Sequence, residues 1–317
     1  MKKNFVFVIV TISVIFSFSS LAWAADLMSI ATAGVAGTYY PIGGAIAAAV
    51  TKGGKITCTA EAANGSVPNI NLVENKEIEM AMAQNDVVYW AYNGQMMFKD
   101  TPKKNIRCVA ALYPEHVHIA LAKDKGIKKI MDIRGKRVSL GAPGSGAHAD
   151  SMAIFDVVGI DEKKDFESVT YADMTGMANR FKDGQLDVGF AVGGAPLPSF
   201  MEVALTKGLD ILDFDKELLS ELCEKYPFFV ASKIPANTYK GVGDVSVPSV
   251  VALLITNASM PEDTVYNFLT AMFDNVQDIR NAHSAAKAIS LETATDGFSV
   301  PAHPGAIKFY KEKGIMK

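Results

Sequence analysis

The chain has 317 residues, of which 49% are hydrophobic and 21% are charged, and its formal net charge at pH 7 is -3. This composition is typical of a globular protein of about two domains, and it excludes a disordered, collagen-like or coiled-coil chain. Basic residues do not cluster with interleaved aromatic residues anywhere in the sequence, so nucleic acid is not an expected partner.

The first 24 residues have the three parts of a secretory signal peptide. Lys2 and Lys3 precede an apolar run from Phe5 to Phe18, and small residues follow at Ala22 and Ala24. We therefore expect cleavage between Ala24 and Ala25 and a periplasmic mature protein. A single transmembrane anchor is the alternative, but the run is shorter than the roughly 20 residues that a spanning helix needs.

Apolar runs of strand length alternate with helical patterns along the chain, which predicts an α/β fold with a largely parallel sheet. The predicted strands are 27–33, 56–61, 78–83, 107–112, 117–123, 137–140 and 186–191, and the predicted helices are 41–51, 67–75, 127–134, 147–158 and 196–207.

A long core-facing helix is predicted near the C-terminus, where apolar residues recur at helical spacing from Val265 to Ile279. Ser259 and Glu262 have the spacing of a capping box, and Pro261 lies between them, so the helix is expected to begin there.

No linker of proline, glycine or serine divides the chain, although about 290 residues exceed one comfortable core. We therefore expect two lobes between which the chain crosses twice, near residues 113–120 and again between 228 and 251. The predicted division is a signal peptide at 1–24, a first lobe at 25–118 and 247–317, and a second lobe at 119–246.

Three glycine-rich turns follow predicted strands and open predicted helices, at residues 34–41, 64–69 and 141–146. Ligands bind at the carboxyl ends of the strands in open α/β sheets, where helix N-termini expose unpaired N–H groups. These turns contain hydroxyl groups but no Lys or Arg, which favours a small anion such as a carboxylate. The alternative is that their glycines and serines only cap helices. The segment Gln84-Asn85-Asp86, at the end of the predicted strand 78–83, is a fourth candidate.

Motifs of other functions are missing from the sequence. The order of glycines at 141–146 differs from the dinucleotide fingerprint, and neither a phosphate-binding P-loop nor a nucleophile elbow occurs. His116 and His118 could face one side of a strand, but no third metal ligand lies near them in sequence. The sequence predicts no catalytic residue, no metal site and no cofactor.

Three cysteines, Cys58, Cys108 and Cys223, are widely spaced and odd in number, so they form neither a disulfide scaffold nor a CxxC site. Either all three are reduced, or one pair forms a bridge and leaves a free thiol. The sequence does not choose between these alternatives.

Nine segments in order resemble the TAXI solute receptors of TRAP transporters, and together they span the chain after residue 36. They are GTYYP at 37–41, GSVPN at 65–69, QND at 84–86, LYPEHVHI at 112–119, GKRVSLGAPGSG at 135–146, KDGQLDVGF at 182–190, YPFF at 226–229, IPANTY at 234–239 and HPGAIKFYKEKG at 303–314.

The resemblance implies a type II periplasmic-binding-protein fold with a ligand cleft between two lobes and a discontinuous first lobe. It implies TRAP membrane subunits as the protein partner, and glutamate, glutamine or a dicarboxylate such as 2-oxoglutarate as the ligand class. The ligand-binding residues that it implies are Gly37, Thr38, Tyr39, Asn64, Ser66, Gln84, Ser145, Gly146, Ala147 and Gly194.

Two departures from the family pattern fall beside the expected cleft. Asn85 replaces the usual Ser, and Ala147 followed by His148 replaces the usual Thr. The ligand can therefore differ from glutamate. Two other functions stay open: an exported hydrolase that uses His148 beside Ser145, and a receptor that serves a membrane sensor instead of a permease.

Overall fold

The computed structural model describes residues 26–317, so the predicted signal peptide lies outside the described residues. One curled sheet runs through the whole molecule in the order β2-β1-β3-β10-β4-β7-β5-β6, with β8 beside β4 and β9 beside β10. The strands are β1 Asp26–Ala31, β2 Ile56–Glu61, β3 Met80–Gln84, β4 Ile106–Leu121, β5 Arg137–Ser139, β6 Ser168–Thr170, β7 Val188–Gly193, β8 Asp210–Ile211, β9 Val230–Ile234 and β10 Val245–Asn257.

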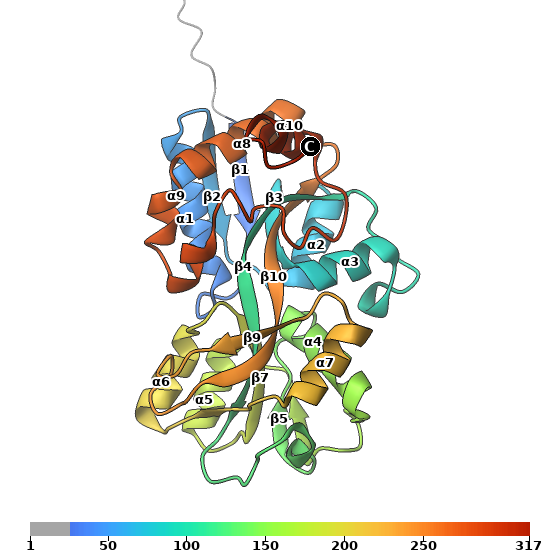
Figure 1. Ribbon diagram of the computed structural model, residues 1–317, viewed down its shortest axis with the longest axis vertical. Coiled ribbons are helices and arrows are strands. Elements are labelled where there is room, and N and C mark those ends of the chain that lie inside the picture. The colour runs from blue at the N-terminus through green and yellow to red at the C-terminus, as the bar shows by residue number, and fades with distance from the viewer. Residues whose placement is uncertain (1–25) are drawn as a thin grey trace, which may run out of the picture.

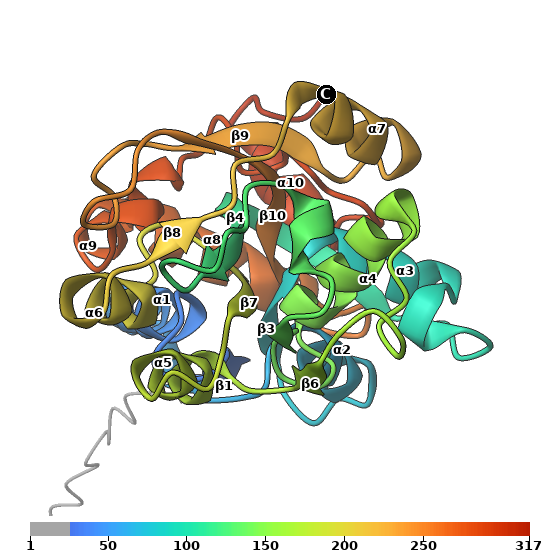
Figure 2. The ribbon, with the colours of Figure 1, turned by 90° about the horizontal axis from the view of Figure 1, so that it is seen from below.

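Helices lie on both sides of this sheet, as Figure 2 shows for α1, α5 and α6 on one side and α2, α3 and α4 on the other. They are α1 Tyr39–Lys52, α2 Ser66–Glu74, α3 Asn85–Asn93, α4 Gly146–Val158, α5 Met174–Lys182, α6 Pro198–Thr206, α7 Lys216–Lys225, α8 Glu262–Asp274, α9 Val276–Arg280 and α10 Pro304–Glu312, with 3-10 turns η1 Met96–Phe98, η2 Ile130–Ile133 and η3 Ser284–Ala288. In the described part of the chain, no helix combines the length and apolarity of a membrane span.

Two lobes are joined by the long strands β4 and β10, which run from one lobe into the other (Figure 1). The first lobe contains β1–β3, α1–α3 and α8–α10, and the second contains β5–β9 and α4–α7. The two expected crossings coincide with these strands. Because both strands are continuous, the predicted boundaries at 118/119 and 246/247 remain predictions.

The sheet is mixed, so the prediction of a largely parallel sheet was wrong. Parallel pairs join β1 to β2 and β3 in the first lobe, and β5 to β6 and β7 in the second. Every pair that involves β4 or β10 is antiparallel. Two chain crossings in opposite directions place antiparallel strands at the centre, which local patterns along the chain do not reveal.

The two strands predicted at 107–112 and 117–123 are a single strand, β4. Pro114 suggested a break, because proline cannot donate to the ladder. It lies opposite Val251 beside a register shift in β10, and it is the one exposed residue of β4. A proline at such an irregularity is tolerated without ending the strand.

The predicted capping box is also wrong, and the predicted C-terminal helix is two helices. The hydroxyl group of Ser259 donates to Asn257 Oδ1, and α8 begins after Pro261 without a side-chain cap. The helix ends at Asn275, whose side-chain amide donates to the Ala271 carbonyl at 2.9 Å. Such local side-chain bonds compete with the helical backbone pattern.

The core consists mainly of the apolar strand residues and the inward faces of the helices. Tyr113, Phe190, Phe268 and Phe309 are among its largest buried side chains. All three cysteines are free; Cys58 and Cys108 are buried, and Cys223 is half-buried.

Candidate functional site

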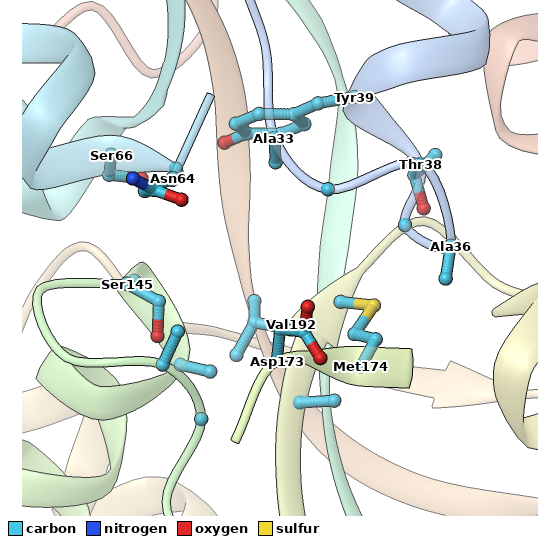
Figure 3. A pocket seen from close by; sticks show the side chains of 18 of the residues that line it. Ala33, Ala36, Thr38, Tyr39, Asn64, Ser66, Ser145, Asp173, Met174 and Val192 are labelled. Carbon is cyan, nitrogen blue, oxygen red and sulfur yellow. The ribbon is translucent and has the colours of Figure 1, made fainter. Parts of the chain in front are cut away.

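A cavity of about 130 Å³ lies between the two lobes. Figure 3 shows Tyr39, Asn64 and Ser66 of the first lobe facing Ser145, Asp173 and Met174 of the second. Its lining comes from segments 33–39, 63–66, 141–147, 172–177 and 190–192, with Gln84 and Glu115.

The fold brings these segments together because they follow strands that end at the same edge. The carboxyl ends of the parallel strands β1 and β2 lead into the loops before α1 and α2. In the second lobe the parallel strands β5 and β6 lead into the loops before α4 and α5. The connecting strands β4 and β10 turn the two edges toward each other across the cavity (Figure 1).

Five helices therefore begin at the cavity: α1, α2, α3, α4 and α5. Their N-cap residues, which are Thr38, Gly65, Gln84, Ser145 and Asp173, all belong to the lining. Ser145 and Asp173 cap their own helices, whereas α1, α2 and α3 have no side-chain cap. Helix N-termini expose N–H groups and the positive ends of the helix dipoles, so this arrangement suits a bound anion.

Nine of the ten residues predicted to bind ligand line this cavity: Gly37, Thr38, Tyr39, Asn64, Ser66, Gln84, Ser145, Gly146 and Ala147. Gly194 does not. Its carbonyl oxygen accepts a hydrogen bond from Thr38 Oγ1 at 3.2 Å, so it joins the lobes beside the cavity.

Gln84 connects the lobes at the back of the cavity. Its backbone N–H donates to Ser66 Oγ at 3.1 Å, and its side-chain amide donates to Asp150 Oδ2 on α4 at 2.9 Å. A Cβ atom on Gly146 would lie 0.9 Å from Gln84 Oε1. An alanine at position 146 would therefore force the Gln84 side chain to move.

Glu115 is a lining residue that the sequence did not single out. It lies on β4, is 2% exposed, and accepts a hydrogen bond from the Tyr39 hydroxyl at 2.7 Å. Burial raises the pKa of its carboxyl group to about 8, against the lowering effect of the Tyr39 hydroxyl. An acidic residue within a buried part of β4 was the available signal.

The start of α5 was missed as well, because the sequence analysis predicted no element between residues 159 and 185. Asp173 caps this helix by accepting a hydrogen bond from the Gly176 N–H at 2.7 Å. Met174 and Thr175 follow it in the lining.

The lining has no Lys, Arg or His, and its ionisable side chains are Tyr39, Glu115 and Asp173. An anion in this cavity would therefore be held by helix N-termini and hydroxyl groups. Glu115 offers the opposite chemistry, because its carboxyl group can accept from a donor or a cationic group of the ligand.

Asn85 and His148, the two departures from the family pattern, do not line the cavity. Asn85 Oδ1 accepts the Val251 N–H at 3.0 Å. The His148 imidazole lies 3.9 Å from the Glu162 carboxylate, and only the backbone N–H of His148 contacts Ser145 Oγ, at 3.2 Å. Ser145 and His148 are thus not arranged as a nucleophile and its base. Within residues 26–317, no three acidic, histidine or cysteine side chains are grouped as metal ligands.

Solved structures share this architecture. The periplasmic binding protein BugD aligns with a TM-score of 0.60 at 9% identity, over 92% of this chain and 95% of that one. MatC of Rhodopseudomonas palustris, solved with bound malate, aligns with a TM-score of 0.56 at 10% identity, over 82% and 88%. A binding component of an ABC phosphonate transporter of Pseudomonas aeruginosa aligns with a TM-score of 0.55 at 11% identity, over 87% and 84%.

At these identities the similarity concerns the fold, which is the two-lobed periplasmic-binding-protein fold expected from the sequence. The family assignment comes from the sequence of the chain. The model of the NMT1-like family matches residues 30–314, nearly the whole described structure, and the chain belongs to the NMT1-like family.

Proposed function

We propose that this protein is an extracytoplasmic solute-binding protein that captures a small carboxylate between its lobes and delivers it to a TRAP membrane transporter. The observation that carries the proposal is the meeting of five helix N-termini, three from the first lobe and two from the second, at one small cavity. The cavity is well below the roughly 300–1,000 Å³ of pockets for drug-sized ligands, which favours a small solute.

A ligand carboxylate would accept hydrogen bonds from the first-turn N–H groups of these helices. Each dipole or charge-assisted bond contributes about 0.3–2 kcal/mol. Because the lining has no cationic side chain, several such contacts must act together. Both lobes supply them, so a bound carboxylate favours the closed arrangement.

Glu115 favours an acidic amino acid such as glutamate, or glutamine, over a plain dicarboxylate such as 2-oxoglutarate. A ligand ammonium group beside Glu115 would provide the positive charge that the lining lacks. The ligand carboxylate would then accept hydrogen bonds from the N–H groups at the helix N-termini. The negative end of the ligand would contact hydrogen-bond donors, and its positive end would contact the Glu115 carboxylate.

Closure would complete the site by adding the contacts of the second lobe. Thr38 with Gly194, and Gln84 with Asp150, are hydrogen-bonded pairs that join the lobes. A ligand shifts an equilibrium between open and closed forms only by the difference in its affinity for them. The closed form is then the one that a permease can recognise.

Delivery to a TRAP transporter rests on the nine sequence segments that resemble TAXI receptors, and export to the periplasm rests on the signal peptide predicted at residues 1–24. The proposal includes no catalytic step.

A thermal-shift screen tests the proposal. The protein is unfolded and refolded to remove carried-over solute and is then screened against amino acids, mono- and dicarboxylates, and sugars. A ligand that binds only the folded state raises the melting temperature with its concentration. One acid that does so supports the proposal, whereas binding of a sugar alone contradicts it. Copurification with permease subunits, rather than with a membrane sensor kinase, tests the delivery step.

A further inference from the structure

Two buried carboxyl groups from opposite lobes face each other behind the cavity. Asp86 lies in the first turn of α3 in the first lobe, and Asp150 lies in the second turn of α4 in the second lobe. Both residues are 0% exposed, and their carboxyl groups are within hydrogen-bonding reach of each other.

The protein supplies these carboxyl groups with few donors. The backbone N–H groups of Asp86 and Val87 lie near the Asp86 carboxyl group but complete no hydrogen bond with it. Gln84 donates one hydrogen bond, to Asp150 Oδ2 at 2.9 Å. Within residues 26–317, Asp150 Oδ1 and both carboxyl oxygens of Asp86 are buried without a hydrogen-bond partner. Buried polar atoms are normally paired, and two ionised carboxylates in contact repel each other, so a donor is required between them.

The surroundings add negative rather than positive charge. Glu115 on β4 acts on both carboxyl groups, and Tyr39 on α1 and Tyr113 on β4 are the titratable groups next to Glu115. The other elements packed against α3 and α4 in the described structure, among them α2, β3, β7, β10 and α7, bring no charged side chain within range of the pair. Burial therefore raises the pKa of both Asp86 and Asp150.

We propose that Asp86 and Asp150 hold one proton between them, and that this proton is a second ligand of the closed form. One carboxyl group then donates its O–H to the other, which is a charge-assisted hydrogen bond across the lobe interface. The role of closure rests on the proposed capture of a solute, but the proton site can be tested in the ligand-free protein.

The proton links closure to pH. When the lobes separate, water solvates each carboxyl group and the two groups move apart. The proton affinity of the pair then falls toward that of an ordinary aspartate. The closed form binds the proton more tightly than the open form and is favoured at low pH. Above the pKa range of an ordinary aspartate, the open form has lost the proton, so the protein must bind a proton in order to close. The ratio of closed to open protein therefore falls by up to tenfold per pH unit.

Trp90 provides the readout. It lies on α3, is 2% exposed, and packs edge-on against Tyr226 and Phe228 of the second lobe, with ring centroids 6.4 and 6.0 Å away. The chain has one other tryptophan, Trp23, so a Trp23→Phe background leaves Trp90 as the single emitter. Opening of the lobes exposes its indole ring to water and shifts its emission to longer wavelength.

The experiment records Trp90 emission between pH 5 and 9 without ligand, with circular dichroism at each pH to establish that the protein stays folded. In the background protein we expect a shift to longer wavelength as pH rises. In Asp150→Asn the shift disappears, because the amide of Asn can donate to Asp86 in place of the proton. Asp86→Asn gives the same test from the first lobe. The exposed Asp183→Asn is the matched control and keeps the shift.

Three results would overturn the proposal: no shift in the background protein, a shift that both Asn variants keep, or a shift that disappears in Glu115→Gln and in neither Asp variant. A shift that depends on sodium instead of choline at fixed pH would also overturn it, because a metal cation would then occupy the pair. If the solute screen finds no ligand while the Asn variants abolish the shift, the proposed function fails and the proton site stands.

Discussion

Gly146 and Gln84 meet across the lobe interface without room for a methyl group between them. A Cβ atom at position 146 would lie 0.9 Å from Gln84 Oε1 and 2.1 Å from its Cδ atom. The same glutamine amide donates to Asp150, so the glycine, the glutamine and the acid form one contact between helix α4 and strand β3. This contact joins the two lobes.

Gly146→Ala should therefore weaken ligand binding tenfold or more, because Gln84 must move and lose its bond to Asp150. Overpacking of this kind costs about 1–3 kcal/mol. Isothermal titration calorimetry with the ligand from the solute screen measures the affinity. Gly44→Ala is the matched control, because a Cβ atom there meets nothing within 4 Å and alanine favours the helix. Equal affinity in the two variants would contradict this prediction.

Glu115→Gln should remove the preference for an amino acid over its keto acid. Gln can still accept the Tyr39 hydroxyl but carries no charge for a ligand ammonium group. We expect the affinity ratio of glutamate to 2-oxoglutarate to fall tenfold or more at pH 9, where Glu115 is charged in the wild type. Asp173→Asn is the control, because it removes the other acid of the lining while Asn still caps α5, so both ligands should change alike.

The same ratio should depend on pH in the wild-type protein. Burial raises the pKa of Glu115 to about 8, so this carboxyl group carries a proton below that pH and is charged above it. The ratio should therefore rise as pH increases through about 8 and should be flat in Glu115→Gln. Both ligands close the lobes, so protons that other groups bind on closure change both affinities equally. The ratio of the two affinities is therefore independent of those groups. A ratio that falls with pH in the wild type would exclude Glu115 as the ammonium partner.

Ser145→Ala should weaken ligand binding several-fold to a hundredfold and lower stability by about 1 kcal/mol, since Ser145 both lines the cavity and caps α4. Asp215→Ala is the matched control. Its carboxylate caps α7 by accepting the Leu218 N–H at 2.8 Å, and it does not line the cavity. The two variants should lose similar stability in urea unfolding, but only Ser145→Ala should lose affinity. A parallel loss of affinity would show that position 145 acts through stability alone.

Asp187→Asn tests the packing of the second lobe. Asp187 accepts two hydrogen bonds from the Arg137 guanidinium, at 2.9 and 2.7 Å, and pairs with Lys125 at 2.9 Å. These partners hold the pKa of Asp187 well below its usual value. The stabilisation is therefore present above about pH 4 and is lost as pH falls below the usual range of aspartate.

Urea unfolding at pH 7 should show Asp187→Asn to be about 1.5–3 kcal/mol less stable than the wild type. At pH 3 the difference should be smaller, because Asp187 then takes up a proton in the unfolded state while it stays ionised in the folded state. An equal difference at the two pH values would mean that the ion pair is not the source of the stability.

Sequence reasoning found the parts of the site that have a local signature. The turns before α1, α2 and α4 each combine glycines with a preceding apolar strand, so their position at strand ends could be inferred. Gly194, which was also predicted to bind ligand, lies beside the cavity and does not line it, because its carbonyl group accepts a hydrogen bond from Thr38.

Glu115 and Asp150 could not be assigned in this way, and Asp86 was included only as part of the candidate segment Gln84-Asn85-Asp86. The role of each acid depends on a partner from a distant segment. Asp86 and Asp150 come from different lobes, which β4 and β10 connect (Figure 1). The mixed character of the sheet has the same origin, since antiparallel pairing here is a consequence of chain crossings.

A crystal structure of the protein with the acid identified by the solute screen tests the central claim most directly. The account predicts a carboxylate within hydrogen-bond distance of N–H groups at the starts of helices from both lobes, with Thr38 and Ser145 beside it, and the other end of the ligand at Glu115. A ligand bound outside the cavity, or a carboxylate that contacts none of these helix N-termini, would contradict it.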